Sequence, residues 1–133
     1  MKRNTILLLI IFVVPLTTYF YVSHTSESNA VISTTNRPQI IKFTSNMCGE
    51  CKKMDVVIKE VYPKYQNEIE IIPIAVQNNT QFNNEMVTKY KVTLVPTIIL
   101  LTKDKNVNKR IEGYVNASTF DNYLRELCND WYY

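Results

Sequence analysis

Two cysteines at the start of a predicted helix constrain this chain more than any other feature. Residues 40–54 read as a short apolar strand, a polar turn and an amphipathic helix whose first turn holds Cys48 and Cys51. Cysteines at such a position face unpaired backbone N–H groups and the positive end of the helix dipole, and both favour the thiolate. Because the thiolate is the attacking species in disulfide exchange, we expect Cys48 to be the nucleophile and Cys51 the resolving thiol.

Two other uses of the C-x-x-C pair stay open at this point. Zinc requires four nitrogen or sulfur ligands, and the rest of the chain offers only Cys128 and His24, which lie far off and lack ligand spacing. A permanently closed structural disulfide is the other alternative, although its loop would be very short. We expect no metal and no organic cofactor, so that the redox group is the Cys48–Cys51 disulfide itself.

The first 22 residues predict a membrane anchor or a signal sequence. Lys2 and Arg3 precede an apolar run from Ile6 to Val22, which at 17 residues is just long enough to span a bilayer. The basic end should stay in the cytoplasm, so the remaining chain is expected outside, where disulfides can form. We favour a single-pass anchor in the cell membrane; a cleaved signal, which would release a secreted protein, is the alternative.

Residues 23–37, rich in Ser, Thr and Asn, predict a flexible tether, and residues 38–133 predict one compact α/β domain. The expected elements are a strand at 39–44, a helix from 49 to about 66, a strand at 69–76, a helix at 82–90, a buried strand ending at 101, an edge strand at 107–111 and a last helix capped by Ser118. The near-continuous apolar run of 69–76 favours a strand that is covered on both faces. Pro63 should end or kink the first helix.

The formal net charge of +3 is too small to indicate a nucleic-acid partner, since no basic stripe with interleaved aromatic residues accompanies it. The third cysteine, Cys128, shares the apolar face of the last helix with Phe120, Leu124 and Leu127. We expect it to be a small buried hydrophobic residue, with an intermolecular disulfide as the alternative.

This arrangement resembles the thioredoxin fold, a central mixed β-sheet flanked by helices, here with an N-terminal hydrophobic helix outside the domain. The resemblance covers about residues 37–130. It rests on the strand–turn–C-x-x-C–helix unit, on Val95-Pro96-Thr97 before a buried strand, and on Glu112-Gly113-Tyr114 before the last helix. The anchored short chain is similar to membrane-tethered bacterial disulfide-bond oxidoreductases, the bacteriocin-associated Bdb-type proteins among them.

The resemblance implies a cis peptide bond at Pro96, beside Cys48, and a Val95 backbone that pairs with an extended substrate. An ordinary loop proline is the alternative. Met47, Gly49 and Glu50 would complete the substrate-binding surface around the cysteines. Two of these positions depart from the family pattern, because Met47 replaces a common tryptophan and Glu50 replaces the proline of cytoplasmic thioredoxins.

Lys42 is a third departure, since thioredoxins usually bury an aspartate there, beneath the second cysteine. Strand alternation places Lys42 on the face opposite Ile41 and Phe43. If it is buried, a neutral Lys42 could accept the proton of Cys51; the alternative is a side chain that reaches solvent. Charges on the helix itself oppose one another, because Glu50 disfavours a Cys48 thiolate and the neighbouring lysines favour it.

The expected function is an extracytoplasmic thiol-disulfide oxidoreductase that exchanges disulfides with exported proteins, in oxidative folding, with a membrane redox partner. A membrane-tethered thiol reductase of the cytochrome c maturation type is the first alternative. A non-catalytic binding module that keeps the fold is the second, and the intact cysteine pair weighs against it.

Overall fold

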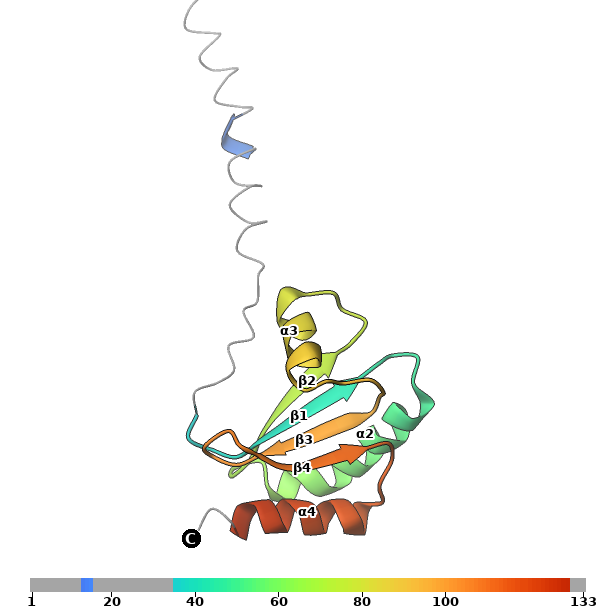
Figure 1. Ribbon diagram of the computed structural model, residues 1–133, viewed down its shortest axis with the longest axis vertical. Coiled ribbons are helices and arrows are strands. Elements are labelled where there is room, and N and C mark those ends of the chain that lie inside the picture. Colours follow the sequence, from blue (N-terminus) through green and yellow to red (C-terminus); the bar gives the residue numbers. More distant parts are fainter. Residues whose placement is uncertain (1–12, 16–34, 130–133) are drawn as a thin grey trace, which may run out of the picture. The chain divides into compact units, whose positions relative to one another are not determined.

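The computed structural model describes residues 13–15 and 35–129 (Figure 1). The chain divides into two compact units, residues 1–32 and residues 33–133, and residues 13–15 of the first unit are helical. Most of the predicted anchor at 1–22, and the tether up to residue 34, lie outside the described residues. Within 13–15 and 35–129, no helix has the length and apolar character needed to cross a membrane.

The second unit alternates strands and helices. In chain order its elements are β1 (Gln39–Thr44), α2 (Gly49–Val61), the 3-10 helix η1 (Tyr62–Lys64), β2 (Glu70–Ala75), α3 (Gln81–Lys89), β3 (Thr97–Leu101), β4 (Val107–Glu112) and α4 (Ala117–Asn129). The predicted first strand is confirmed residue for residue. The first helix is shorter than the predicted 49 to about 66, because α2 ends at Val61. Pro63, which lacks an N–H, lies in the tighter turn η1 that follows, so the prediction that Pro63 ends or kinks the helix is confirmed.

The four strands form one sheet in the order β2-β1-β3-β4 (Figure 1). β1 is parallel to β2 and antiparallel to β3, and β4 is antiparallel to β3, so the sheet is mixed, as predicted. The register of β1 and β3 pairs Phe43 with Thr97. This pair matters for the site because Phe43 lies five residues before Cys48 and Thr97 directly follows Pro96.

Helices cover both faces of the sheet. α2 and α4 pack together against the face that carries Ile40 and Ile98, and this layer is the main hydrophobic core. Ile41 and Phe43 point the other way, as strand alternation requires, and the rings of Phe43 and Tyr90 at the end of α3 lie 6.1 Å apart. Figure 1 shows α3 separated from α2 and α4 by the sheet.

The expectation that the 69–76 segment is covered on both faces is only partly right. β2 is an edge strand in which Ile74 is buried, Ile71 and Ile72 are half-buried and Pro73 is exposed. An edge strand tolerates Pro73 because its outer backbone groups need no strand partner. The apolar run therefore reflects two covering helices, and the hydrophobicity pattern alone does not reveal that one side of the strand lacks a neighbouring strand.

The start of the domain is fixed at the end of the sheet that lies away from the cysteines. Lys105, in the turn between β3 and β4, donates from Nζ to the carbonyl oxygens of Thr35 and Arg37, at 2.9 and 3.0 Å. The hydroxyl of Thr35 donates to Glu70 at 2.7 Å. The chain thus enters the domain before β1, whereas Cys48 follows the other end of β1.

The cap of α4 differs from the prediction. Asn116, rather than Ser118, precedes the helix, and its Oδ1 accepts the N–H of Thr119 at 2.8 Å. A side-chain oxygen just before the helix satisfies one of the N–H groups that the first turn leaves unpaired. Ser118 lies inside the first turn, where its hydroxyl is not needed for this role.

We predict that Asn116→Ala lowers the free energy of unfolding by about 1 kcal/mol, the usual contribution of an N-cap. Ser118→Ala is the matched control and should change it by less than about half of that amount. Chemical denaturation of both variants measures the difference. Equal losses, or a larger loss for Ser118→Ala, would show that the cap is assigned to the wrong residue.

Candidate active site

The turn between β1 and α2 presents Cys48 at the helix N-terminus. Cys48 has extended backbone angles and is the N-cap of α2, and its Sγ accepts the backbone N–H of Cys51 at 3.0 Å. The N–H of Cys48 itself donates to the carbonyl oxygen of Ser45 at 3.2 Å, which closes the turn. A thiolate at this position would receive the same N–H bond and would face the positive end of the helix dipole.

The two cysteines are joined as a disulfide, with Cα atoms 5.2 Å apart. They differ in access: Cys48 is half-buried, whereas Cys51 is 2% exposed and packs beneath the first turn of α2. An attacking thiolate therefore reaches the sulfur of Cys48 first. This geometry supports the predicted division between an outer reacting cysteine and an inner resolving one.

The loop before β3 lies beside this disulfide. The Val95–Pro96 peptide bond is cis, which confirms the prediction, and the carbonyl oxygen of Val95 is 3.5 Å from the Cys48 sulfur. Two hydrogen bonds hold the loop in place. The Thr97 hydroxyl donates to the carbonyl oxygen of Leu94 at 2.8 Å. The Gly113 N–H donates to the carbonyl oxygen of Pro96, also at 2.8 Å. The sheet register thus brings together residues about 47 positions apart in the sequence.

An apolar rim accompanies the disulfide. Met47 is 97% exposed, and Leu94 and Tyr114, which flank the cis-proline loop and the Gly113 hydrogen bond, are also exposed. Large exposed apolar side chains in one region are typical of a surface that contacts another molecule. The predicted substrate-binding role of Met47 and Val95 stays a prediction. Leu94 and Tyr114 were missed, although each adjoins a motif that the sequence already singles out.

The charges next to Cys48 offset one another. Glu50 and Lys53 form an exposed ion pair at 2.8 Å, and the hydrogen bond to Glu50 raises the pKa of Lys53. Because the pair carries no net charge, the effects of Glu50 and Lys53 largely cancel, and Lys52, which is exposed, adds a charge that water screens. The backbone N–H groups of α2 then remain as the main local source of positive potential.

Lys42 lies on the predicted face of β1, and its partner was missed. Its Nζ donates to a carboxylate oxygen of Asp55 on α2, and its side chain is 15% exposed. Lys42 is thus held in an ion pair between strand and helix, which is neither the isolated buried lysine nor the solvent-reaching side chain considered above. Its role as a proton acceptor for Cys51 stays a prediction. Asp55 follows Cys51 by four residues, a helical spacing that could have revealed it.

The third cysteine is buried in the main core, as predicted, and is free. Burial, and then a hydrogen bond to Glu68 and the charge of that residue, raise the pKa of the Cys128 thiol to about 12. The thiol is therefore protonated at neutral pH. Since the thiolate is the reactive form, Cys128 should take no part in exchange while the protein is folded.

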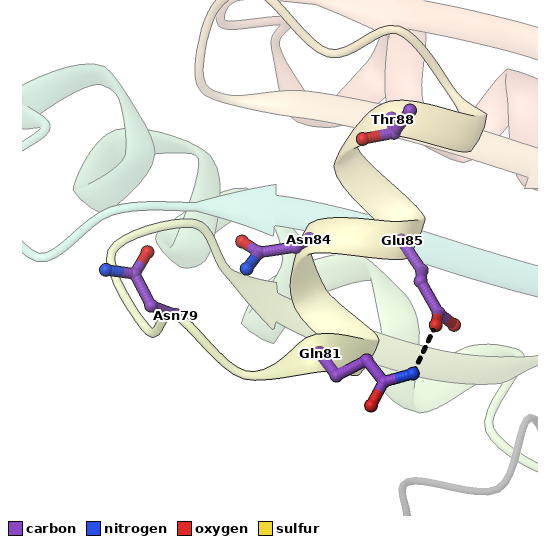
Figure 2. Close-up of a pocket in the computed structure, with 5 residues that line it drawn as sticks. All are labelled: Asn79, Gln81, Asn84, Glu85 and Thr88. Atoms are coloured by element: carbon purple, nitrogen blue, oxygen red, sulfur yellow. Dashed lines mark hydrogen bonds between the residues drawn. The ribbon is translucent and has the colours of Figure 1, made fainter.

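Other parts of the described chain offer less chemistry. Among residues 13–15 and 35–129, no cluster of three or more histidine, cysteine or acidic side chains could hold a metal ion. A shallow hollow lies along α3, where the amide of Gln81 donates to Glu85 at 2.9 Å (Figure 2). Its lining is polar and contains no cysteine: Asn79, Gln81, Asn84, Glu85 and Thr88. We therefore place the candidate active site at the cysteine pair.

Comparison with known proteins gives a consistent result. The family model described as thioredoxin matches residues 20–126. The thioredoxin of Borreliella burgdorferi is 25% identical over 69% of this chain and 74% of its own length. The thioredoxin of Mycobacterium tuberculosis is 29% identical over 81% of this chain and 85% of its own length.

Solved structures agree in fold. Chloroplastic thioredoxin z superposes with a TM-score of 0.61 at 20% identity, over 72% of this chain and 82% of that one. Oxidized thioredoxin O2 from Arabidopsis thaliana superposes with a TM-score of 0.60 at 20% identity, over 70% and 76% of the two chains. At this level of identity the structures bear on the fold alone.

We predict that alkylation separates the buried thiol from the reactive pair. In the reduced folded protein at pH 8, where Cys128 is buried and its raised pKa keeps the thiol protonated, iodoacetamide should modify Cys48 and leave Cys128 intact. Unfolding in urea should expose Cys128 to modification at the rate of an ordinary thiol. Mass spectrometry of peptides locates the label, and rapid labelling of Cys128 in the folded protein would contradict its assignment as an inert core residue.

Proposed function

The chain belongs to the thioredoxin family and is a thiol-disulfide oxidoreductase, and we propose that it acts outside the cytoplasm, exchanging disulfides with exported proteins during oxidative folding. We further propose a membrane-tethered enzyme of the Bdb type. One observation carries the activity: the half-buried sulfur of Cys48 accepts the N–H of Cys51 and lies 3.5 Å from the Val95 carbonyl oxygen, beside a cis proline.

The geometry supports a stepwise exchange. A substrate thiolate attacks the Cys48 sulfur, a substrate–Cys48 disulfide forms, and the Cys48–Cys51 bond breaks with Cys51 leaving as a thiolate that takes up a proton. A second substrate thiolate then attacks the substrate sulfur and releases Cys48. The substrate loses two electrons and the enzyme gains them, as a dithiol. A disulfide-bearing partner outside the cytoplasm must then reoxidise the enzyme.

The substrate-side contacts follow from the same loop. Val95 and Pro96 are held by Thr97 and Gly113, so their backbone is positioned before any substrate arrives. An extended peptide lying along this loop would place its own cysteine next to Cys48 and its apolar side chains against Met47. Unfolded exported proteins present such extended, apolar segments, and this supports them as the substrate class.

The proposed location outside the cytoplasm is supported by the sequence. The place where the chain enters the domain bears on a separate point, the access of substrates to a tethered disulfide. Lys2, Arg3 and the apolar run to Val22 indicate export with the domain outside. Thr35 joins the domain before β1, and Cys48 follows the end of that six-residue strand, about 20 Å away at the usual rise of a strand. A tether ending there would leave the disulfide open to large substrates.

We predict that the purified chain in oxidised form introduces disulfides into reduced ribonuclease, and that Cys48→Ser removes this activity, because the attacked sulfur is missing. Cys51→Ser, which cannot hold the disulfide, should instead accumulate a mixed disulfide when it is offered insulin, because the Cys48 thiolate attacks an insulin disulfide and no second cysteine releases it. Non-reducing gels show this species. Insulin reduction run in parallel assigns direction. Activity in insulin reduction alone would replace oxidative folding by the thiol-reductase alternative, and no activity in either assay would favour a binding module.

We predict that a membrane-impermeant maleimide labels Cys48 of the full-length chain in intact, mildly reduced bacterial cells, because the domain lies outside. Cys48→Ser is the control for the labelled site. Retention of the protein in membranes after a carbonate wash would indicate an anchor, and release would indicate a cleaved signal. Labelling only after lysis would overturn the extracytoplasmic location.

A further inference from the structure

An ion pair lies in the layer between α2 and the sheet, next to the resolving cysteine. Lys42 on β1 donates from Nζ to a carboxylate oxygen of Asp55 on α2. The two side chains are 15% and 38% exposed, so water screens this pair less than it screens the surface pair of Glu50 and Lys53. Each charge therefore acts on nearby groups more strongly than an exposed charge would.

The helix places one of these charges close to Cys51. Residues four apart on a helix are neighbours, with Cβ atoms about 5–6 Å apart, and Asp55 follows Cys51 by four. Cys51 is 2% exposed, so its sulfur shares this poorly solvated layer. Lys42 reaches the same layer from below, because it shares a strand face with Ile40, which packs in the α2 core.

Near the pair, the residues that the structure describes are uncharged, paired with each other or exposed to water. Across the sheet, Lys42 is in register with Pro73 on β2 and with Ile98 on β3, and neither carries charge. On α2, Glu50 and Lys53 bind each other at the surface. Lys52 and Lys59 lie three and four residues from Asp55 on α2, and both are exposed, so water screens their charges. Within the described part of the chain, we therefore attribute the charge effect on the interior side of the disulfide to Lys42 and Asp55.

Resting on the proposed function, we propose that Lys42 and Asp55 exert opposite effects on the reduction potential of the Cys48–Cys51 couple, and that their ion pair keeps either charge from shifting that potential. Reduction breaks the S–S bond with two electrons and, when one proton is taken up, leaves one thiolate and one thiol. A nearby cation stabilises that negative charge and makes the disulfide more oxidising, whereas a nearby anion does the reverse. The pair keeps both effects in balance. This role does not require Lys42 to lose its proton.

The test is a set of glutathione redox equilibria. Asp55→Asn leaves Lys42 uncompensated and should shift the equilibrium constant about tenfold, or about 30 mV, toward a more oxidising protein. Lys42→Met leaves Asp55 uncompensated and should shift it in the opposite direction. The double variant, Lys42→Met with Asp55→Asn, should return to within about threefold of the wild type.

Matched controls separate charge from structure. Lys103→Met and Asp104→Asn make the same charge changes in the turn between β3 and β4, at the end of the sheet away from the cysteines, and should shift the equilibrium less than about twofold. A purely structural role for the pair would lower the melting temperature without moving the equilibrium in opposite directions. If one single variant fails to fold, the other still has its own expected sign. If both fail, the charge-exchanged variant, Lys42→Asp with Asp55→Lys, should stay within about threefold of wild type, and a larger shift would contradict the balance.

The outcomes also distinguish this inference from the proposed function. Shifts in the same direction, or shifts no larger than those of the controls, would overturn the role of the pair and leave the exchange activity intact. A wild-type protein that does not equilibrate with glutathione at all would overturn the proposed function itself.

Discussion

The account depends on one contact, the hydrogen bond from the Cys51 backbone N–H to the Cys48 sulfur at 3.0 Å. It makes Cys48 the N-cap of α2, so the reactive sulfur occupies the position where a helix offers unpaired N–H groups and positive potential. The same contact holds Cys48 toward solvent while Cys51 stays beneath the turn. The Cys48 sulfur and the Cys51 N–H therefore both begin the helix and take part in the redox site.

The sheet is what makes this contact useful to a substrate. Antiparallel pairing of β1 with β3 sets Phe43 opposite Thr97, and this register carries Pro96 to the turn that holds Cys48. The hydrogen bond from Gly113 then attaches the loop to the end of β4. Three strand ends thus converge on one disulfide, and the helices that cover both faces of the sheet keep them in place. The thioredoxin family assignment is the expected consequence of this geometry.

The parts of the fold that follow from local chemistry could be predicted. The strand at Gln39–Thr44 and the cysteine pair at the start of a helix rest on short motifs, and the structure confirms both. The cis bond before Pro96, which the structure also confirms, was predicted from the resemblance to the thioredoxin fold. Contacts between helices and strands were harder to predict, because no local sequence pattern specifies them. The pairing of Lys42 with Asp55 joins a strand to a helix across 13 positions, and neither alternative considered for Lys42, a buried neutral side chain or one that reaches solvent, included it.

Smaller errors have the same origin. Ser118 and Asn116 are both good N-cap residues, and only the actual start of α4 decides between them. The position of β2 at the sheet edge depends on which strands pair, which the hydrophobicity of Ile71 and Ile72 does not encode. The same holds for function. The sequence predicts disulfide exchange by the cysteines, whereas the contact between Lys42 on β1 and Asp55 on α2, which bears on their reduction potential, comes from the structure.

The most direct test of the central contact is the ionisation of Cys48 measured alone. In a variant with Cys51→Ala and Cys128→Ser, the backbone N–H of residue 51 remains and Cys48 is the one thiol left. Thiolate absorbance near 240 nm is followed against pH in the folded protein and in the same protein unfolded in urea. The account predicts that the thiolate forms at a clearly lower pH in the folded protein. Formation at the same or a higher pH would contradict it.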